Sequence, residues 1–175
     1  MSRMTRRPAL LLSIAALVAA VAAQSPAGAQ TLEERMRAAA GAYERKDFTA
    51  ALAEWKPLAA EGNAEAQTLL GAMYWQGEGV PRDHSEAAKW YLKAADQGYA
   101  RAQNDIGFMY GFGEGIPPHD DVQAYKWISL AIERYTDKNR DRREQAVEDR
   151  ATLAARMSKA EIAEAERLIR EWKPK

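Results

Sequence analysis

A stretch of about 36 residues is repeated in this chain of 175 residues, and such self-similarity constrains the fold more than any other feature. The segment YWQGEGVP begins at Tyr74, and YGFGEGIP begins 36 residues later at Tyr110. Beyond these loops the spacing becomes 37, because one residue is inserted near Pro117-Pro118. The matched pairs are Ala64/Ala100, Ala66/Ala102, Gly71/Gly107, Tyr74/Tyr110, Gly77/Gly113, Gly79/Gly115, Val80/Ile116 and Pro81/Pro117, then Asp83/Asp120, Ala87/Ala124, Lys89/Lys126, Trp90/Trp127 and Ala94/Ala131.

A weaker copy of the pattern precedes these two segments. We expect the second helix of this degenerate unit within residues 47–63 and its first helix within residues 31–46, where apolar side chains recur every three or four residues. Its repeat positions, 36 residues before those of the next unit, are Asp47, Ala51, Trp55, Ala59 and Gly62.

Each unit is predicted to consist of a helix, a corner and a second helix. In the first complete unit the helices are expected at residues 64–76 and 83–97. Asp83 stands where a helix N-cap is wanted, and Gly98 stands where a left-handed residue would end the second helix. The chain after residue 29 lacks the alternation of period two that strands require, so no strand is expected.

Two glycines, Gly71 and Gly107, recur at the repeat period inside the first helices. Glycine in a helix interior costs about 1 kcal/mol relative to alanine. Its recurrence therefore indicates a packing reason, namely that the bare Cα lets the paired helix approach closely.

The pattern A-x-A-x3-LG-x2-Y-x2-G-x-GV-x2-D-x3-A-x2-WY-x2-AA-x2-G closely resembles the Sel1-like repeat, a relative of the tetratricopeptide repeat. The resemblance is specific for residues 64–131 and fair for residues 47–62. It implies an all-α fold, an α/α right-handed superhelical solenoid of Sel1-like helix pairs, whose members usually act as adaptors for other proteins. It implies no common catalytic residue. The second copy departs from the pattern at Ile116, at the added proline and at Ile128, and the first copy carries it on Ala64, Ala66, Leu70, Gly71, Tyr74, Gly77, Gly79, Val80, Asp83, Ala87, Trp90, Tyr91, Ala94, Ala95 and Gly98.

The first 29 residues have the order of a secretory signal peptide. A basic start, MSRMTRR, is followed by an apolar run at residues 9–23 and by the small residues Ala27-Gly28-Ala29. We expect cleavage after Ala29, with the bond between Ala23 and Gln24 as the second choice. Export would make the protein periplasmic or secreted. An uncleaved anchor is the alternative, although the run is shorter than the roughly 20 residues that span a bilayer.

Charge and cysteine content exclude several classes of function. The chain has 25 basic and 25 acidic residues, and the first 29 residues hold three of the arginines and no acid, so the exported protein would be mildly acidic. That balance argues against a nucleic-acid partner. The chain has no cysteine, so disulfides and a lipidated cysteine anchor are excluded.

No catalytic, cofactor or metal site is predicted. The G-x-G loops lack the third glycine of a dinucleotide loop and the lysine of a P-loop, so their glycines are expected to supply positive φ or close approach between helices. His84 and His119 have no second histidine or cysteine at ligand spacing, and we expect both in exposed loops. No serine has a lysine three residues on. Glu78 and Glu114 are expected to accept backbone N–H bonds or to face solvent, rather than to form a carboxylate pair.

Aromatic residues divide into core and candidate surface positions. Those at repeat positions, Trp55, Trp90, Tyr91 and Trp127, are expected in the core. Three others fall at first-helix positions where the two copies differ, and first helices of such solenoids line the concave face. They are candidate anchors for a protein partner, with two polar neighbours adding contacts. These five residues are Trp75, Asn104, Asp105, Phe108 and Phe112; the alternative is that the aromatic ones pack between neighbouring repeats.

The tail beyond the repeats is expected to be helical. Residues 132–157 form a mixed-charge helix with a solvated face. Ser158 and Glu161 then make a capping box before an amphipathic terminal helix that covers the apolar end of the last repeat. The alternative is that Ile169 and Trp172 dock a partner or a membrane surface. The expected division is therefore a signal peptide at 1–29, a degenerate helix pair at 30–62, repeats at 63–98 and 99–135, and capping helices at 136–175.

The expected function is a non-catalytic protein–protein interaction module, an adaptor or scaffold exported to the bacterial envelope. Its partners would be proteins of the cell envelope, without nucleic acid, cofactor or a stable membrane anchor after signal cleavage. The alternatives are an envelope hydrolase acting on peptidoglycan or a β-lactam, and a structural part of a polysaccharide or secretion assembly. The identity of the partner and the oligomeric state stay open.

Overall fold

The computed structural model describes residues 30–116 and 118–175, so the expected signal peptide at 1–29 lies outside the described residues. The described helices lie in the compact unit Glu33–Lys175, apart from Leu32, the first residue of α2. The described residues form α-helices and a 3-10 helix without any strand, as predicted. No helix among them is long and apolar enough to cross a membrane. The elements are α2 (Leu32–Glu44), α3 (Phe48–Ala60), α4 (Ala64–Gln76), α5 (His84–Asp96), α6 (Ala100–Phe112), α7 (Asp121–Arg134), η1 (Asp137–Asn139), α8 (Arg140–Ala154) and α9 (Lys159–Glu171).

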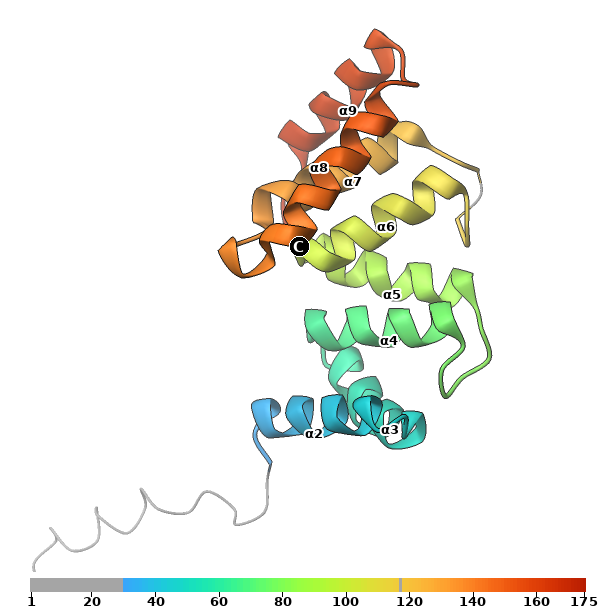
Figure 1. Cartoon of the computed structure of the whole chain (residues 1–175), viewed down its shortest axis with the longest axis vertical. Coiled ribbons are helices and arrows are strands. Elements are labelled where there is room, and N and C mark those ends of the chain that lie inside the picture. The colour runs from blue at the N-terminus through green and yellow to red at the C-terminus, as the bar shows by residue number, and fades with distance from the viewer. Residues whose placement is uncertain (1–29, 117) are drawn as a thin grey trace, which may run out of the picture. The chain divides into compact units, whose positions relative to one another are not determined.

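Successive helices from α3 to α8 pack against one another along the stack (Figure 1). The predicted helices of the first complete unit are confirmed, because α4 and α5 occupy the expected residues. The side chain of Asp83 accepts a 2.9 Å hydrogen bond from the backbone N–H of Glu86 and caps α5. Asp120 caps α7 in the same way through the N–H of Gln123. Gly98 has a φ of 87°, the left-handed conformation expected after α5.

The helix-interior glycines lie where paired helices cross most closely. A Cβ added at Gly71 would come within 3.0 Å of the Tyr91 ring and 3.3 Å of the carbonyl oxygen of Ala87. One added at Gly107 would come within 2.7 Å of Ile128 Cγ1. These contacts confirm the packing reason predicted for both glycines, since the missing side chain is what lets the helix pairs α4/α5 and α6/α7 approach.

The corner loops join neighbouring units. Gly79 and Gly115 have φ angles of 73° and 71°, which side-chain-bearing residues rarely adopt. Gly79 lies against Phe48, the first residue of α3, so that an added Cβ would be 2.9 Å from Phe48 Cβ. Gly115 lies in the same way against the backbone of His84, the first residue of α5. Each loop therefore rests on the second helix of the preceding unit, whereas the close approach was predicted between paired helices.

The core holds the aromatic residues of the repeat positions. Trp55, Tyr91 and Trp127 are buried, at 2%, 5% and 3% exposure. Trp90 is half-buried and packs at the edge of the cluster around Trp55, with the Lys93 ammonium 4.1 Å from its ring centroid. Burial of these large rings contributes apolar stabilisation to the stack.

The tail is broken where a continuous helix was expected over residues 132–157. Helix α7 ends at Arg134, and η1 precedes α8. The break has a packing reason, since the turn at residues 135–139 brings α8 back against α7.

Helix α9 also packs on α7, and Ser158 and Glu161 form the predicted capping box at its start. The Trp172 ring lies edge-on to Trp127, with centroids 6.2 Å apart.

Candidate functional site

The five candidate residues lie on two first helices. Trp75 is near the end of α4, and Asn104, Asp105, Phe108 and Phe112 are on α6. Residues three and four apart share one side of a helix, so the four α6 residues form a continuous stripe. The structure brings three of the five together, since Trp75, Asp105 and Phe108 line one cleft between α4 and α6.

The cleft between α4 and α6 has a volume of about 260 Å³ and combines aromatic walls with one carboxylate. Tyr91 contributes to its floor, and Arg101 lies 3.9 Å from the Asp105 carboxylate. Burial raises the pKa of Asp105 to about 6, against the lowering effect of Arg101 and Arg142. The positive charge of Arg101 therefore does not fully offset the loss of hydration at Asp105.

Trp75 is held in place by a histidine rather than standing free. Its ring stacks on that of His84, with centroids 4.1 Å apart and an interplanar angle of 15°. Nδ1 of His84 lies 3.7 Å from the Glu114 carboxylate. The expectation that His84 is an exposed loop residue is wrong. Its ring is half-buried and connects Glu114, in the corner loop of the second repeat, to Trp75, in the first helix of the first repeat.

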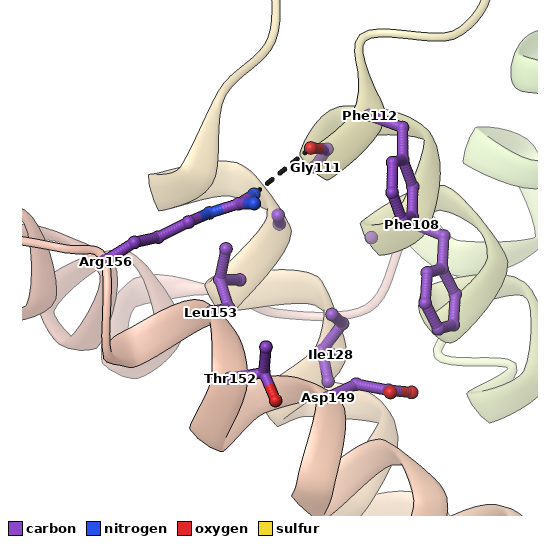
Figure 2. A pocket seen from close by; sticks show the side chains of 10 residues that line it. Phe108, Gly111, Phe112, Ile128, Asp149, Thr152, Leu153 and Arg156 are labelled. Atoms are coloured by element: carbon purple, nitrogen blue, oxygen red, sulfur yellow. Dashed lines mark hydrogen bonds between the residues drawn. The ribbon is translucent and has the colours of Figure 1, made fainter.

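A second cleft, of about 140 Å³, lies between α6, α7 and α8 (Figure 2). The rings of Phe108 and Phe112 form one wall and are stacked, with centroids 6.2 Å apart and an interplanar angle of 9°. Ile128 of α7 and Leu153 of α8 line the opposite side. Phe112 is 70% exposed, the largest exposed fraction of any large apolar side chain among the described residues.

Arg156, in the turn after α8, closes one end of this cleft. Its guanidinium donates to both carboxylate oxygens of Asp121, at 3.0 and 2.6 Å, and to the carbonyl oxygen of Gly111 at 3.2 Å (Figure 2). Its Nη2 atom is also 3.1 Å from Nε2 of His119, which approaches Asp121 at 2.8 Å. The charge of Arg156 is thus already paired, and the residue connects the end of α8 to the start of α7 and the end of α6.

Asp149 lines the same cleft from α8. Its Oδ1 atom accepts a 3.0 Å hydrogen bond from Gln145, while its Oδ2 atom is buried and has no hydrogen-bond partner among the described residues. Asp149, Thr152, Leu153 and Arg156 were not predicted as site residues. Nothing in the spacing of this mixed-charge run set them apart from its solvated face.

Phe108 lines both clefts and joins them into one surface. We call this surface the α6 groove and define it by Trp75, Asp105, Phe108, Phe112, Asp149 and Leu153. Asn104 lines neither cleft; its amide oxygen is buried on α6 without a hydrogen-bond partner among the described residues.

Glu114 is exposed, which is one of the two arrangements expected for the loop glutamates, whereas Glu78 differs from both. Glu78 accepts a 2.6 Å hydrogen bond from the phenol of Tyr43 in α2, and Glu114 faces His84. The predicted backbone N–H bonds are absent from the described part of the chain, because each carboxylate instead reaches a side chain of the preceding unit. Within those described residues no group of three or more histidine, aspartate and glutamate side chains could hold a metal ion.

Comparisons with known proteins agree with this architecture. Residues 64–99 and 100–135 each match the family model of the Sel1 repeat. The crystal structure of a protective antigen present in uropathogenic Escherichia coli strains, which displays an SLR fold, is similar with a TM-score of 0.71 and 27% identity over 80% of this chain. A Sel1 repeat protein from Oxalobacter formigenes is similar with a TM-score of 0.53 and 36% identity over 57% of this chain.

The similar region spans 29% of the Escherichia coli protein and 39% of the Oxalobacter protein, so both are much longer than the part they share with this chain. A comparison with curated proteins gave no match. The family is one of generally non-catalytic repeats that serve protein interaction. The two matches to the family model show that this chain contains two consecutive Sel1 repeats, α4–α5 and α6–α7, in an all-helical repeat fold.

Proposed function

We propose that this protein is a non-catalytic adaptor of the bacterial envelope that holds a segment of a partner protein in the α6 groove. The observation that carries the proposal is the stacked pair of Phe108 and Phe112 between two clefts, with Phe112 70% exposed. Exposed aromatic anchors beside preformed pockets provide much of the binding energy of protein interfaces.

The groove is organised before a partner arrives. Stacking against Phe108 and against His84 restricts the rotamers of Phe112 and Trp75, so less side-chain freedom is lost on binding. The ion pair between Arg156 and Asp121 fixes the α8 wall in the same sense. This preorganisation supports a binding function, because less of the interaction energy is spent on ordering the surface.

The polar groups of the groove support binding rather than hydrolysis. Its two carboxylates, Asp105 and Asp149, line separate clefts. A general acid–base pair needs both groups within reach of one bond. The arrangement suits recognition of two features of a partner better than chemistry at one point.

The envelope location rests on the signal-peptide pattern of residues 1–29. It is tested by expressing the full chain in a bacterium and determining the N-terminus of the protein in the periplasmic fraction. We expect the chain there to begin at Gln30. An uncleaved chain in the cytoplasmic fraction would contradict the location without touching the binding proposal.

The binding function is tested by cross-linking and affinity capture from envelope extracts, followed by affinity measurement with the purified partner. Phe112→Ser should remove capture, because it deletes the proposed anchor. The variant should still fold, since this exposed ring can be truncated with little effect on stability. Leu32→Ser is the matched control, since Leu32 is also an exposed apolar residue, at 51%, but lies outside the groove. Equal capture by Phe112→Ser and by the unaltered protein would rule out the α6 groove.

A further inference from the structure

The cleft between α6 and α8 has apolar walls but contains a carboxylate oxygen without a donor. Asp149 Oδ2 is buried, while Oδ1 is satisfied by Gln145. Figure 2 shows the Asp149 side chain extending from α8 toward the side where Phe108 lies. A buried carboxylate oxygen that makes no hydrogen bond costs free energy, so the cleft gains most from a ligand that supplies a donor at this point.

From this arrangement, and resting on the proposed function of the α6 groove, we propose that the cleft between α6 and α8 binds a basic side chain, lysine or arginine, of the partner protein. The methylene stem lies along Phe112, Phe108 and Leu153. The charged end donates a hydrogen bond to Asp149 Oδ2. A cation near the face of Phe108 is further stabilised by the ring quadrupole, and long basic side chains readily combine an apolar stem with a charged end.

The charges around the cleft favour a cation over an anion. The guanidinium of Arg156, which lines the cleft, is paired with Asp121. Arg150, next to Asp149 in sequence, lies over the ring of Tyr125 at 5.8 Å and is directed toward α7. Glu148, the preceding neighbour, is exposed and adds negative charge. An acidic ligand would therefore meet repulsion at the unpaired carboxylate oxygen of Asp149.

The test starts from a library of random 12-residue peptides displayed on phage, selected on protein purified after expression of the full chain. We expect the selected peptides to share a lysine or arginine next to apolar residues, and their binding to depend on Phe112. For one such peptide, fluorescence anisotropy should show that Asp149→Asn weakens binding about 30-fold or more, as is typical when one partner of a buried charge pair is removed. Glu148→Gln, the control with the same loss of charge at an exposed site, should change binding less than about twofold.

Replacing the basic residue of the peptide by norleucine tests the same contact on unaltered protein, so the proposal stays testable if Asp149→Asn fails to fold. Its effect should be similar to that of Asp149→Asn, and the two changes together should weaken binding little more than either alone. Peptides that need Phe112 but carry no shared basic residue, or that bind equally well to Asp149→Asn, would overturn this inference and leave the proposed function standing. Failure to select any peptide that depends on Phe112 would count against both.

Discussion

The phenol of Tyr43 donates a 2.6 Å hydrogen bond to the carboxylate of Glu78, across 35 residues of sequence. Tyr43 lies in α2, in the degenerate first unit, and Glu78 lies in the corner loop of the first complete repeat. The bond raises the pKa of Tyr43 to about 12, with burial as the next cause. The degenerate unit, whose repeat pattern is the weakest, is thus fastened to the stack by a charge-assisted hydrogen bond.

Tyr43→Phe should lower the free energy of unfolding by about 1 kcal/mol, because it removes one hydrogen bond and keeps the ring. Since the folded state holds the phenol proton more tightly than the unfolded chain, this contribution is complete below pH 10 and is lost as the pH rises toward 12. Urea unfolding of both proteins at pH 8 and in the alkaline range measures it. A difference that stays constant up to pH 12 would contradict the assignment to this bond.

Gly107→Ala should destabilise the protein although alanine favours helices. The added Cβ would lie 2.7 Å from Ile128 Cγ1 and 3.2 Å from the backbone nitrogen of Ile128, so α6 and α7 must move apart. Overpacking of this kind costs about 1–3 kcal/mol, which exceeds the gain of about 1 kcal/mol in helix propensity. Thermal unfolding followed by circular dichroism measures the balance.

Gly41→Ala provides the control for this comparison. Gly41 also lies inside a helix, but its added Cβ would meet only the flexible end of Arg45, at 3.3 Å. Here the propensity gain should dominate and raise stability by about 0.5–1 kcal/mol. If both alanine variants shift the midpoint in the same direction, the close crossing at Gly107 does not limit side-chain size.

Asp105→Asn should stabilise the protein at pH 7.5 and leave its stability unchanged near pH 4. Burial raises the pKa of Asp105 to about 6, so the folded state favours the protonated carboxyl and loses stability as the pH rises through 6. Removing the ionisation should recover up to about 2 kcal/mol at pH 7.5. Urea unfolding at both pH values tests this, and Asp137→Asn, a change at an exposed acid, should show no such pH dependence.

Trp172→Ala should destabilise the fold by about 1–3 kcal/mol, less than the loss of a fully buried tryptophan. The ring packs on Trp127, and the Arg134 guanidinium lies 4.4 Å from its centroid. Lys173→Ala, at an exposed neighbour, is the control. Unchanged stability together with lost partner capture would instead favour the docking role considered for Trp172.

The repeats could be predicted from the sequence because their packing depends on residue size at fixed spacing. Gly71 and Gly107 mark the crossings, and Asp83 and Asp120 mark helix starts that local hydrogen bonds determine. Outside the repeat this regularity stops. The turn after Arg134 lies at the end of the repeats, so no matching position in another unit indicates how the chain turns there. The break in the helix expected over 132–157 was therefore missed.

The groove was predicted in part, for a similar reason. Its α4 and α6 walls follow from the helix positions of Trp75, Phe108 and Phe112. The α8 wall depends on which face of α8, a helix outside the repeats, lies against α6. No pattern in residues 140–154 indicates that face. Asp149 therefore resembled one more solvated acid in a mixed-charge run. Tyr43 and Glu78 were missed as a pair because their contact joins side chains of different units.

The corner glycines determine how such an array can lengthen. Gly79 rests on Phe48 and Gly115 rests on His84, and both pairs are related by the same shift along the sequence. A duplicated unit of this length contains its own corner loop. It also contains the first residue of a second helix, against which the corner loop of the following unit packs. New copies can therefore be added by duplication inside the array without any new contact having to evolve, whereas deleting part of a unit leaves one loop without its support.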